Sequence, residues 1–257
     1  MKTITVWNMK GGVGKTTISF NLAANLAAKG KRVFCMDLDP QANLTSYFET
    51  GNKARLHKEN LSMLSARKFE DIKKGIYRSK YKNLDFIRGC NYEVNIESIC
   101  DMKDGLEQVE AAYDYCILDC PPDFSRITQS ALYATDLVLV PINLDGFSRD
   151  NLNLVQSNLA IIEQIKEERL SDGQDSEIPY YIISNRVANR RTQKEVYQDL
   201  VTKHDYPILD ICVSESAAVA SSTAAHKPLY AHRRFSSVAR DLAELADAVV
   251  ELAEGVE

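Results

Sequence analysis

The segment from Met9 to Thr17, which reads MKGGVGKTT, constrains the fold of this chain more than any other. An apolar run, TITVW, begins at residue 3 and predicts a strand directly before the segment. After the segment, apolar residues recur at helical spacing: Ile18, Leu22 and Leu26. The sequence therefore predicts a strand, a glycine-rich loop and a helix that begins around Gly14.

A loop of this composition between a strand and a helix is suited to binding phosphate. Glycines let backbone N–H groups converge on phosphate oxygens, and the helix N-terminus adds the positive end of its dipole. Lys15 is placed to reach the β- and γ-phosphates of a nucleotide, and the Thr16 hydroxyl is placed to bind Mg²⁺. The strict phosphate-loop pattern is not met, because Met9 stands where the first glycine belongs and an extra lysine, Lys10, follows it. The predicted nucleotide-binding residues of the loop are Lys10, Gly11, Gly12, Val13, Gly14, Lys15, Thr16 and Thr17.

Short apolar runs rich in β-branched residues alternate along the chain with stretches of helical spacing. This alternation predicts an α/β fold: a doubly wound, mostly parallel sheet with helices on both faces, as in P-loop NTPases. The predicted strands are 3–7, 32–37, 84–87, 115–119, 136–142 and 180–184. An amphipathic helix with an acidic outer face is predicted from Phe235 onward. The loop 171–177 is too short to link independent domains, so residues 1–257 are predicted to form one domain with a variable segment at about 50–110.

Composition excludes several classes of protein. The chain is 45% hydrophobic and 26% charged, which is ordinary for a soluble globular protein. No apolar run approaches the roughly 18 residues that a membrane span requires, so a cytoplasmic location is expected. Six cysteines include no C-x-x-C pair, which argues against a zinc knuckle or a thioredoxin-like site.

The net charge of −5 hides an uneven distribution. Residues 53–82 carry +7 and residues 184–240 carry +4, whereas residues 83–183 carry −13 and residues 241–257 carry −6. The negative net charge argues against nucleic acid as a partner. The two basic segments, however, could still bind nucleic acid.

The sequence KGGVGKTT, with a second lysine five residues before the loop lysine, resembles the deviant phosphate loop of the ParA/MinD superfamily of P-loop ATPases. In that family the extra lysine of each subunit reaches the phosphates bound by its partner, so that ATP holds a sandwich dimer together. The resemblance implies an ATPase with ATP and Mg²⁺ as cofactors, which forms a homodimer in which Lys10 acts on the partner's nucleotide. Two lysines on one short loop cannot easily serve one nucleotide from the same side, which agrees with this role.

Two aspartates end the second predicted strand. Asp37 and Asp39 are two residues apart, so both point to the same side of an extended chain, at the strand end where α/β sheets bind ligands. The sequence DLDPQ resembles the second acidic motif of the family. The resemblance implies that Asp39 orients the attacking water and is catalytic together with Lys10 and Lys15.

A third carboxylate and an amide complete the predicted site. The strand YCILD ends in Asp119 and is followed by Pro121 and Pro122, which resembles the Walker B motif and switch of the family. The resemblance implies that Asp119 and Thr16 hold Mg²⁺. Asn185 closes the strand 180–184, where the family recognises adenine, and an amide can pair with the donor–acceptor edge of that base.

The branch of the superfamily is indicated by charge. A membrane-binding relative would end in a basic amphipathic helix, but residues 241–257 carry six acids and no Lys or Arg, which argues against membrane binding. Cys35, Cys116 and Cys212 fall on strand-like runs, and the cysteines are interpreted as buried structural thiols rather than iron–sulfur ligands. The chain therefore resembles Soj-type or small plasmid ParA proteins. This resemblance implies a DNA segregation ATPase that is associated with the nucleoid when ATP-bound. A ParB-like centromere-binding protein would stimulate its weak hydrolysis and release it.

Nonspecific contacts to double-stranded DNA would come from Lys and Arg side chains on phosphates. The candidates are Arg190, Arg191, Lys194, Arg233 and Arg234. The basic segment 53–82 could add contacts, form a solvated helix or dock a partner.

Two other functions remain open. The first is a ParA-like ATPase that positions a protein cargo with the same chemistry. The second is a small-molecule P-loop ligase or kinase of the dethiobiotin-synthetase type, which would need a substrate pocket but no second lysine.

Overall fold

A single sheet organises the computed structural model, which describes residues 1–49, 59–91, 94, 96–169, 176–188, 190–204 and 206–255. Within these residues the sheet has eight strands in the order β3-β4-β2-β5-β1-β6-β7-β8. All neighbouring strands are parallel except β3 and β4. The strands are β1 (Lys2–Val6), β2 (Val33–Asp37), β3 (Ile76–Arg78), β4 (Leu84–Ile87), β5 (Tyr115–Asp119), β6 (Leu137–Asn143), β7 (Tyr180–Val187) and β8 (Ile208–Ser214).

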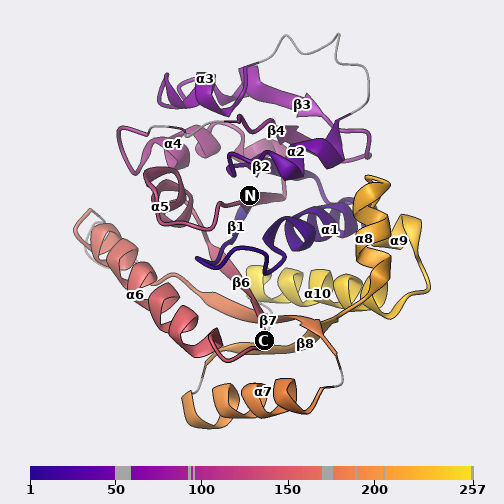
Figure 1. Ribbon diagram of the computed structural model, residues 1–257. Coiled ribbons are helices and arrows are strands. Elements are labelled where there is room, and N and C mark those ends of the chain that lie inside the picture. Colours follow the sequence, from indigo (N-terminus) through magenta and orange to yellow (C-terminus); the bar gives the residue numbers. More distant parts are fainter. Residues whose placement is uncertain are drawn as a thin grey trace.

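Helices cover both faces of the sheet (Figure 1). One face packs against α3 (Leu61–Ser65), α4 (Asp101–Glu107), α5 (Arg126–Tyr133), α6 (Ser148–Glu167) and α7 (Arg191–His204). The other face packs against α1 (Lys15–Ala28), α2 (Asn43–Phe48), α8 (Ala217–Ala224), α9 (Leu229–His232) and α10 (Ser237–Glu254). Two short 3₁₀ helices are η2 (Ile72–Gly75) and η3 (Glu110–Ala112).

Alternation along the central strands divides the core into two layers. In β2, Phe34 and Met36 join the layer under α5 and α6, whereas Val33 and Cys35 join the layer under α1 and α10. Successive side chains of a strand point to opposite faces, so a strand buried on both faces is apolar throughout. This physical constraint produces the runs on which the fold prediction rests, and the doubly wound α/β prediction is confirmed.

All six predicted strands are present, and two further strands, β3 and β8, were not predicted. These two are the edges of the sheet. β3 has three residues, and most of β8 is partly exposed, so neither shows the continuous apolar run of a central strand. Residues 171–175 of the predicted loop, and residues 50–58, 92, 93 and 95 of the variable segment, lie outside the described residues; this includes residues 53–58 of the basic segment.

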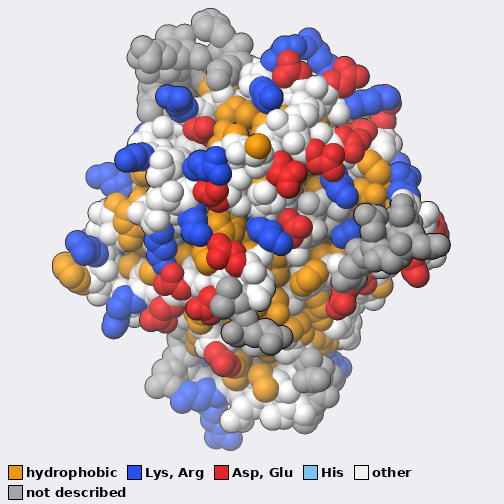
Figure 2. Space-filling model, turned by 180° about the vertical axis from the view of Figure 1, so that it is seen from behind, with side chains coloured by type: hydrophobic (Ala, Val, Ile, Leu, Met, Phe, Trp, Pro, Cys, Tyr) orange, Lys and Arg blue, Asp and Glu red, His pale blue; other side chains and the backbone are white. Residues whose placement is uncertain are grey.

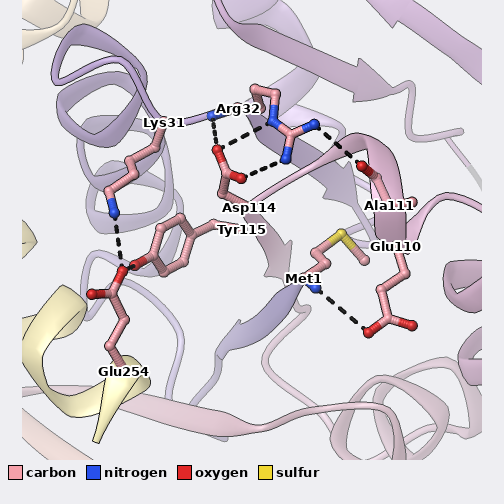
Figure 3. Close-up of polar contacts among 8 residues, drawn as sticks. All are labelled: Met1, Lys31, Arg32, Glu110, Ala111, Asp114, Tyr115 and Glu254. Carbon is pink, nitrogen blue, oxygen red and sulfur yellow. Dashed lines mark hydrogen bonds and ion pairs between the residues drawn. The ribbon is translucent and has the colours of Figure 1, made fainter. Parts of the chain in front are cut away.

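A polar network connects the last helix to the amino ends of the strands β2 and β5 (Figure 3). Glu254, at the end of α10, accepts hydrogen bonds from Lys31 Nζ at 3.0 Å and from the Tyr115 hydroxyl at 2.7 Å. Arg32 and Asp114 form an ion pair at 2.7 Å, which lowers the pKa of Asp114. Exposed pairs of this kind contribute little to the stability of a fold, because water screens them. The carboxyl ends of the parallel strands, where ligands bind in such sheets, lie on the side of the sheet away from this network.

Candidate nucleotide-binding site

The loop between β1 and α1 owes its shape to two glycines. Gly12 has φ 74° and Gly14 has φ 98°, both in the left-handed region that favours glycine. Gly14 directly precedes the first residue of α1. A Cβ on Gly14 would clash with the side-chain nitrogen of Asn185, so the close approach also requires glycine. The loop therefore presents its backbone at the N-terminus of α1, as an anion-binding loop requires.

Lys15 is the first residue of α1, directly after the loop, and is 7% exposed. Its ammonium group donates hydrogen bonds to the carbonyl oxygens of Asn8, at 3.0 Å, and Lys10, at 3.1 Å. Burial lowers the pKa of Lys15, whereas the nearby carboxylates of Asp119 and Asp39 oppose that shift. The loop's own carbonyl groups thus hold a buried cation at the centre of the site.

Asp37 and Asp119 lie side by side, since they are register partners on β2 and β5. Asp37 Oδ2 accepts from the backbone N–H and the hydroxyl of Thr45, both at 2.7 Å, and Asp119 Oδ1 accepts from the Ser19 hydroxyl at 2.8 Å. Burial raises the pKa of both aspartates, and Asp37 adds to the rise at Asp119.

Each of these carboxylates also has an oxygen that is buried without a hydrogen-bond partner among the described residues: Asp37 Oδ1 and Asp119 Oδ2. Leaving a buried polar oxygen unpaired costs free energy. Carboxylate oxygens are hard ligands of the type that Mg²⁺ prefers, and Mg²⁺ sites use few protein ligands besides phosphate and water. The two carboxylates therefore fit a magnesium ion.

Asp39 lies further out, where it is half-buried. Its Oδ1 accepts a hydrogen bond from the backbone N–H of Gln41 at 2.8 Å. Asp39 lines a cavity of about 530 Å³ together with the loop and with residues 121–123, which follow β5. The structure thus brings Lys15, Thr16 and Asp39 to one cavity.

A second cavity, of about 780 Å³, adjoins the first, since Gly14, Thr16 and Thr17 line both. Asn185 lines this second cavity, and its amide nitrogen donates to the Val13 carbonyl at 2.6 Å. Sequence reasoning missed Arg186, which lines both cavities. The one sequence signal for Arg186 is its position on a strand, directly after the predicted site residue Asn185.

Lys10 is placed differently from Lys15. Its ammonium nitrogen lies 2.5 Å from Oδ2 of Asp145, which follows β6, and 5.8 Å from the ring centre of Phe147. Lys10 is not among the described residues that line either cavity. Sequence reasoning also missed Asp145, because a separation of 135 residues carries no local signal.

The residues predicted to contact DNA lie in two places. Arg190, directly before α7, pairs with Glu215 at 2.7 Å, and Arg191, the first residue of α7, pairs with Glu195 at 2.8 Å. Lys194, on α7, lines a separate cavity of about 390 Å³. Arg233 and Arg234 lie between α9 and α10 and form no ion pair within the part of the chain that the structure describes.

The fold and this loop define a P-loop protein of the doubly wound α/β class. The family model described as an AAA domain matches residues 1–172. A virulence plasmid ParA family protein of Chlamydia psittaci is 31% identical over 239 residues, which cover 86% of each chain. The chain belongs to the ParA family.

Solved structures agree on the fold. A plasmid-partition-type protein from Borrelia burgdorferi B31, bound to AMPPNP, is similar with a TM-score of 0.75 and 25% identity, over 98% of this chain and 97% of that one. A cobyrinic acid a,c-diamide synthase from Mycobacterium smegmatis, with bound ADP and magnesium, has a TM-score of 0.80 at 19% identity, over 100% and 96% of the two chains. Among the described residues, no helix is both long and apolar enough to span a membrane.

Proposed function

We propose that this protein is a DNA-partition ATPase that binds ATP with Mg²⁺, dimerises on it, binds DNA nonspecifically and is released when a ParB-like partner stimulates hydrolysis. The observation that carries the proposal is the separation of the two loop lysines. Lys15 is buried between the loop's own carbonyl groups, whereas Lys10 lies outside both cavities against Asp145. This separation supports a role for Lys15 on the chain's own nucleotide and for Lys10 on the nucleotide of a second chain.

Nucleotide binding would use the paired cavities. The phosphates would lie in the smaller cavity against the N-terminus of α1 and Lys15, and the nucleoside in the larger one beside Asn185. Asp119, with Asp37 and the Thr16 hydroxyl, would hold Mg²⁺. The ion would neutralise phosphate charge when bound. One N–H of the Asn185 amide already bonds Val13, so its oxygen and its second N–H are left for the base.

Hydrolysis would depend on Asp39. Protein groups in phosphoryl transfer chiefly position the reactants and stabilise charge. Asp39 lines the phosphate-side cavity and is half-buried, so its carboxylate can accept a hydrogen bond from a water in that cavity. Loss of Asp39 should depress hydrolysis and spare ATP binding.

DNA binding would use unpaired surface cations. Arg233 and Arg234 precede α10, next to Phe235, which is 93% exposed. Figure 2 shows Lys and Arg side chains gathered along the flank at the left of that view, on the side where α8 and α9 lie in Figure 1. Cations on one flank contact phosphates without reading bases, which favours nonspecific binding and association with the nucleoid in the cytoplasm.

The test is a titration of random double-stranded DNA with wild-type protein in ATP, in ADP and without nucleotide, beside Lys15→Ala in ATP. The proposal predicts tight binding in ATP alone and weak binding by Lys15→Ala. Equal DNA binding in all four samples would contradict a nucleotide-controlled switch.

ATP-dependent dimerisation without DNA binding would favour a ParA-like protein that positions a protein cargo. A protein that stays a monomer in ATP would favour the small-molecule enzyme.

A further inference from the structure

Arg186 has an unusual backbone conformation for a side chain of its size. Its φ is 53°, in the left-handed region. The register between β7 and β8 pairs Asn185 with Val213 and Val187 with Ser214, so Arg186 is the extra residue of a β-bulge. Conformations of this kind cost about 1–3 kcal/mol and persist only where the surroundings fix them.

Gln193 fixes this conformation from α7. Its side-chain nitrogen donates to the carbonyl oxygen of Arg186 at 3.1 Å, and its side-chain oxygen accepts from the backbone N–H of Ala188 at 2.7 Å. Gln193 is only 9% exposed. One buried amide therefore makes two hydrogen bonds to the backbone on either side of the bulge.

The bulge changes which side of the sheet Arg186 meets. In a regular strand, the residue after Asn185 would point to the opposite face. Here Arg186 lines the same cavity as Asn185, and it also lines the phosphate-side cavity. It therefore lies at the junction of the two cavities, as Gly14, Thr16 and Thr17 do.

Charge pairing leaves Arg186 available for a ligand. Glu215, an acidic residue of the larger cavity, is already paired with Arg190. Arg186 is exposed and has no ion pair within the described ranges. In the phosphate-side cavity, the cations among the described lining residues are Lys15 and Arg186.

We propose that Arg186 binds the phosphate chain of the nucleotide from the β7 side of the site. The proposal rests on the proposed ATP-binding function. A guanidinium group suits phosphate because it donates parallel hydrogen bonds to two oxygens. The strain at Arg186 is then the structural cost of bringing a strand residue to the ligand.

The conformation supplies a sharp test, because glycine at residue 186 removes the cation and relieves the strain together. Nucleotide affinity is measured by calorimetry with ATP and with ADP in Mg²⁺, and the thermal midpoint is measured without nucleotide. Arg186→Gly should unfold at the same or a higher temperature than wild type and bind both nucleotides roughly tenfold or more weakly. Arg186→Lys, which keeps the charge, should bind with intermediate affinity.

Lys68→Gly is the matched control, because Lys68 is also an exposed cation in the left-handed region, with φ 54°, and is absent from the described lining of both cavities. It should bind nucleotide as wild type does. Wild-type affinity in Arg186→Gly, or an equal loss in Lys68→Gly, would overturn the inference and leave the proposed function standing. Failure of the wild-type protein itself to bind either nucleotide would instead contradict the proposed function.

Discussion

The Lys10 ammonium nitrogen lies 2.5 Å from Oδ2 of Asp145, within the same chain. Asp145 is itself held, because its Oδ1 accepts from the backbone N–H of Phe147 at 3.1 Å. Both side chains of the pair are about one-third exposed, at 33% and 39%. If Lys10 is to reach a partner's nucleotide, this pair must first break.

Asp145→Asn should therefore favour the ATP dimer. A partly exposed pair is worth about 0.2–1 kcal/mol and two such pairs break per dimer, so the dimer dissociation constant should fall by roughly two- to thirtyfold. Sedimentation velocity in ATP, on an Asp39→Ala background that slows hydrolysis, measures this constant. Asp150→Asn, a nearby change on α6, is the control and should have no effect. A weaker dimer in Asp145→Asn would show that Asp145 supports the interface instead.

Gly14→Ala should destabilise the fold by roughly 1–3 kcal/mol, because φ is 98° and the new Cβ would meet Asn185. Asn185→Ala should cost about 1–3 kcal/mol, because it removes a buried hydrogen bond to Val13. The double variant should cost less than the sum, since Asn185→Ala removes the clash. Urea unfolding measures all three. Gly11→Ala, where a Cβ meets nothing within 4 Å, is the control. Additive costs would show that the clash with Asn185 is relieved some other way.

The buried carboxylates predict a pH dependence of stability. Burial raises the pKa of Asp119 to about 8, well above its ordinary value of about 4. Between these values the folded chain holds more protons than the unfolded chain, so the free energy of unfolding should fall as pH rises. Urea unfolding from pH 5 to 8, without nucleotide or Mg²⁺, should show this fall. Asp119→Asn should flatten the slope, and Asp247→Asn, on the exposed side of α10, should not. A wild-type stability that rises with pH over this range would contradict the burial argument.

The two arginine pairs should differ in their effect on DNA binding. Arg190 and Arg191 are paired with Glu215 and Glu195, whereas Arg233 and Arg234 carry no such partner in the described chain. Replacing Arg233 and Arg234 with Ala should weaken binding about equally across sequences. It should also reduce the salt slope by up to about 2, since each phosphate contact contributes about 0.9. The Arg190→Ala/Arg191→Ala variant should lose less. The reverse order, measured by fluorescence anisotropy in ATP at several salt concentrations, would place the DNA surface on α7.

The sequence predicted the fold and the loop because both depend on local patterns. Apolar runs follow from burial on both faces, and the glycines follow from positive φ at Gly12 and Gly14. Arg186 and Asp145 could not be predicted in the same way. A bulge at a non-glycine residue leaves no compositional mark, and the partner of Lys10 is set by how β6 lies beside β1. The edge strands were missed because partial exposure removes the apolar run that marks a central strand.

Whether ATP joins two chains through Lys10 is decided most directly by the molar mass of the Asp39→Ala protein, measured by light scattering with ATP and Mg²⁺. Twice the chain mass is expected in ATP, the mass of one chain in ADP, and the mass of one chain in ATP when Lys10→Ala is added. The added change should leave ATP binding intact. A dimer that persists without Lys10, or an Asp39→Ala protein that stays a monomer at saturating ATP, would contradict the role given to Lys10.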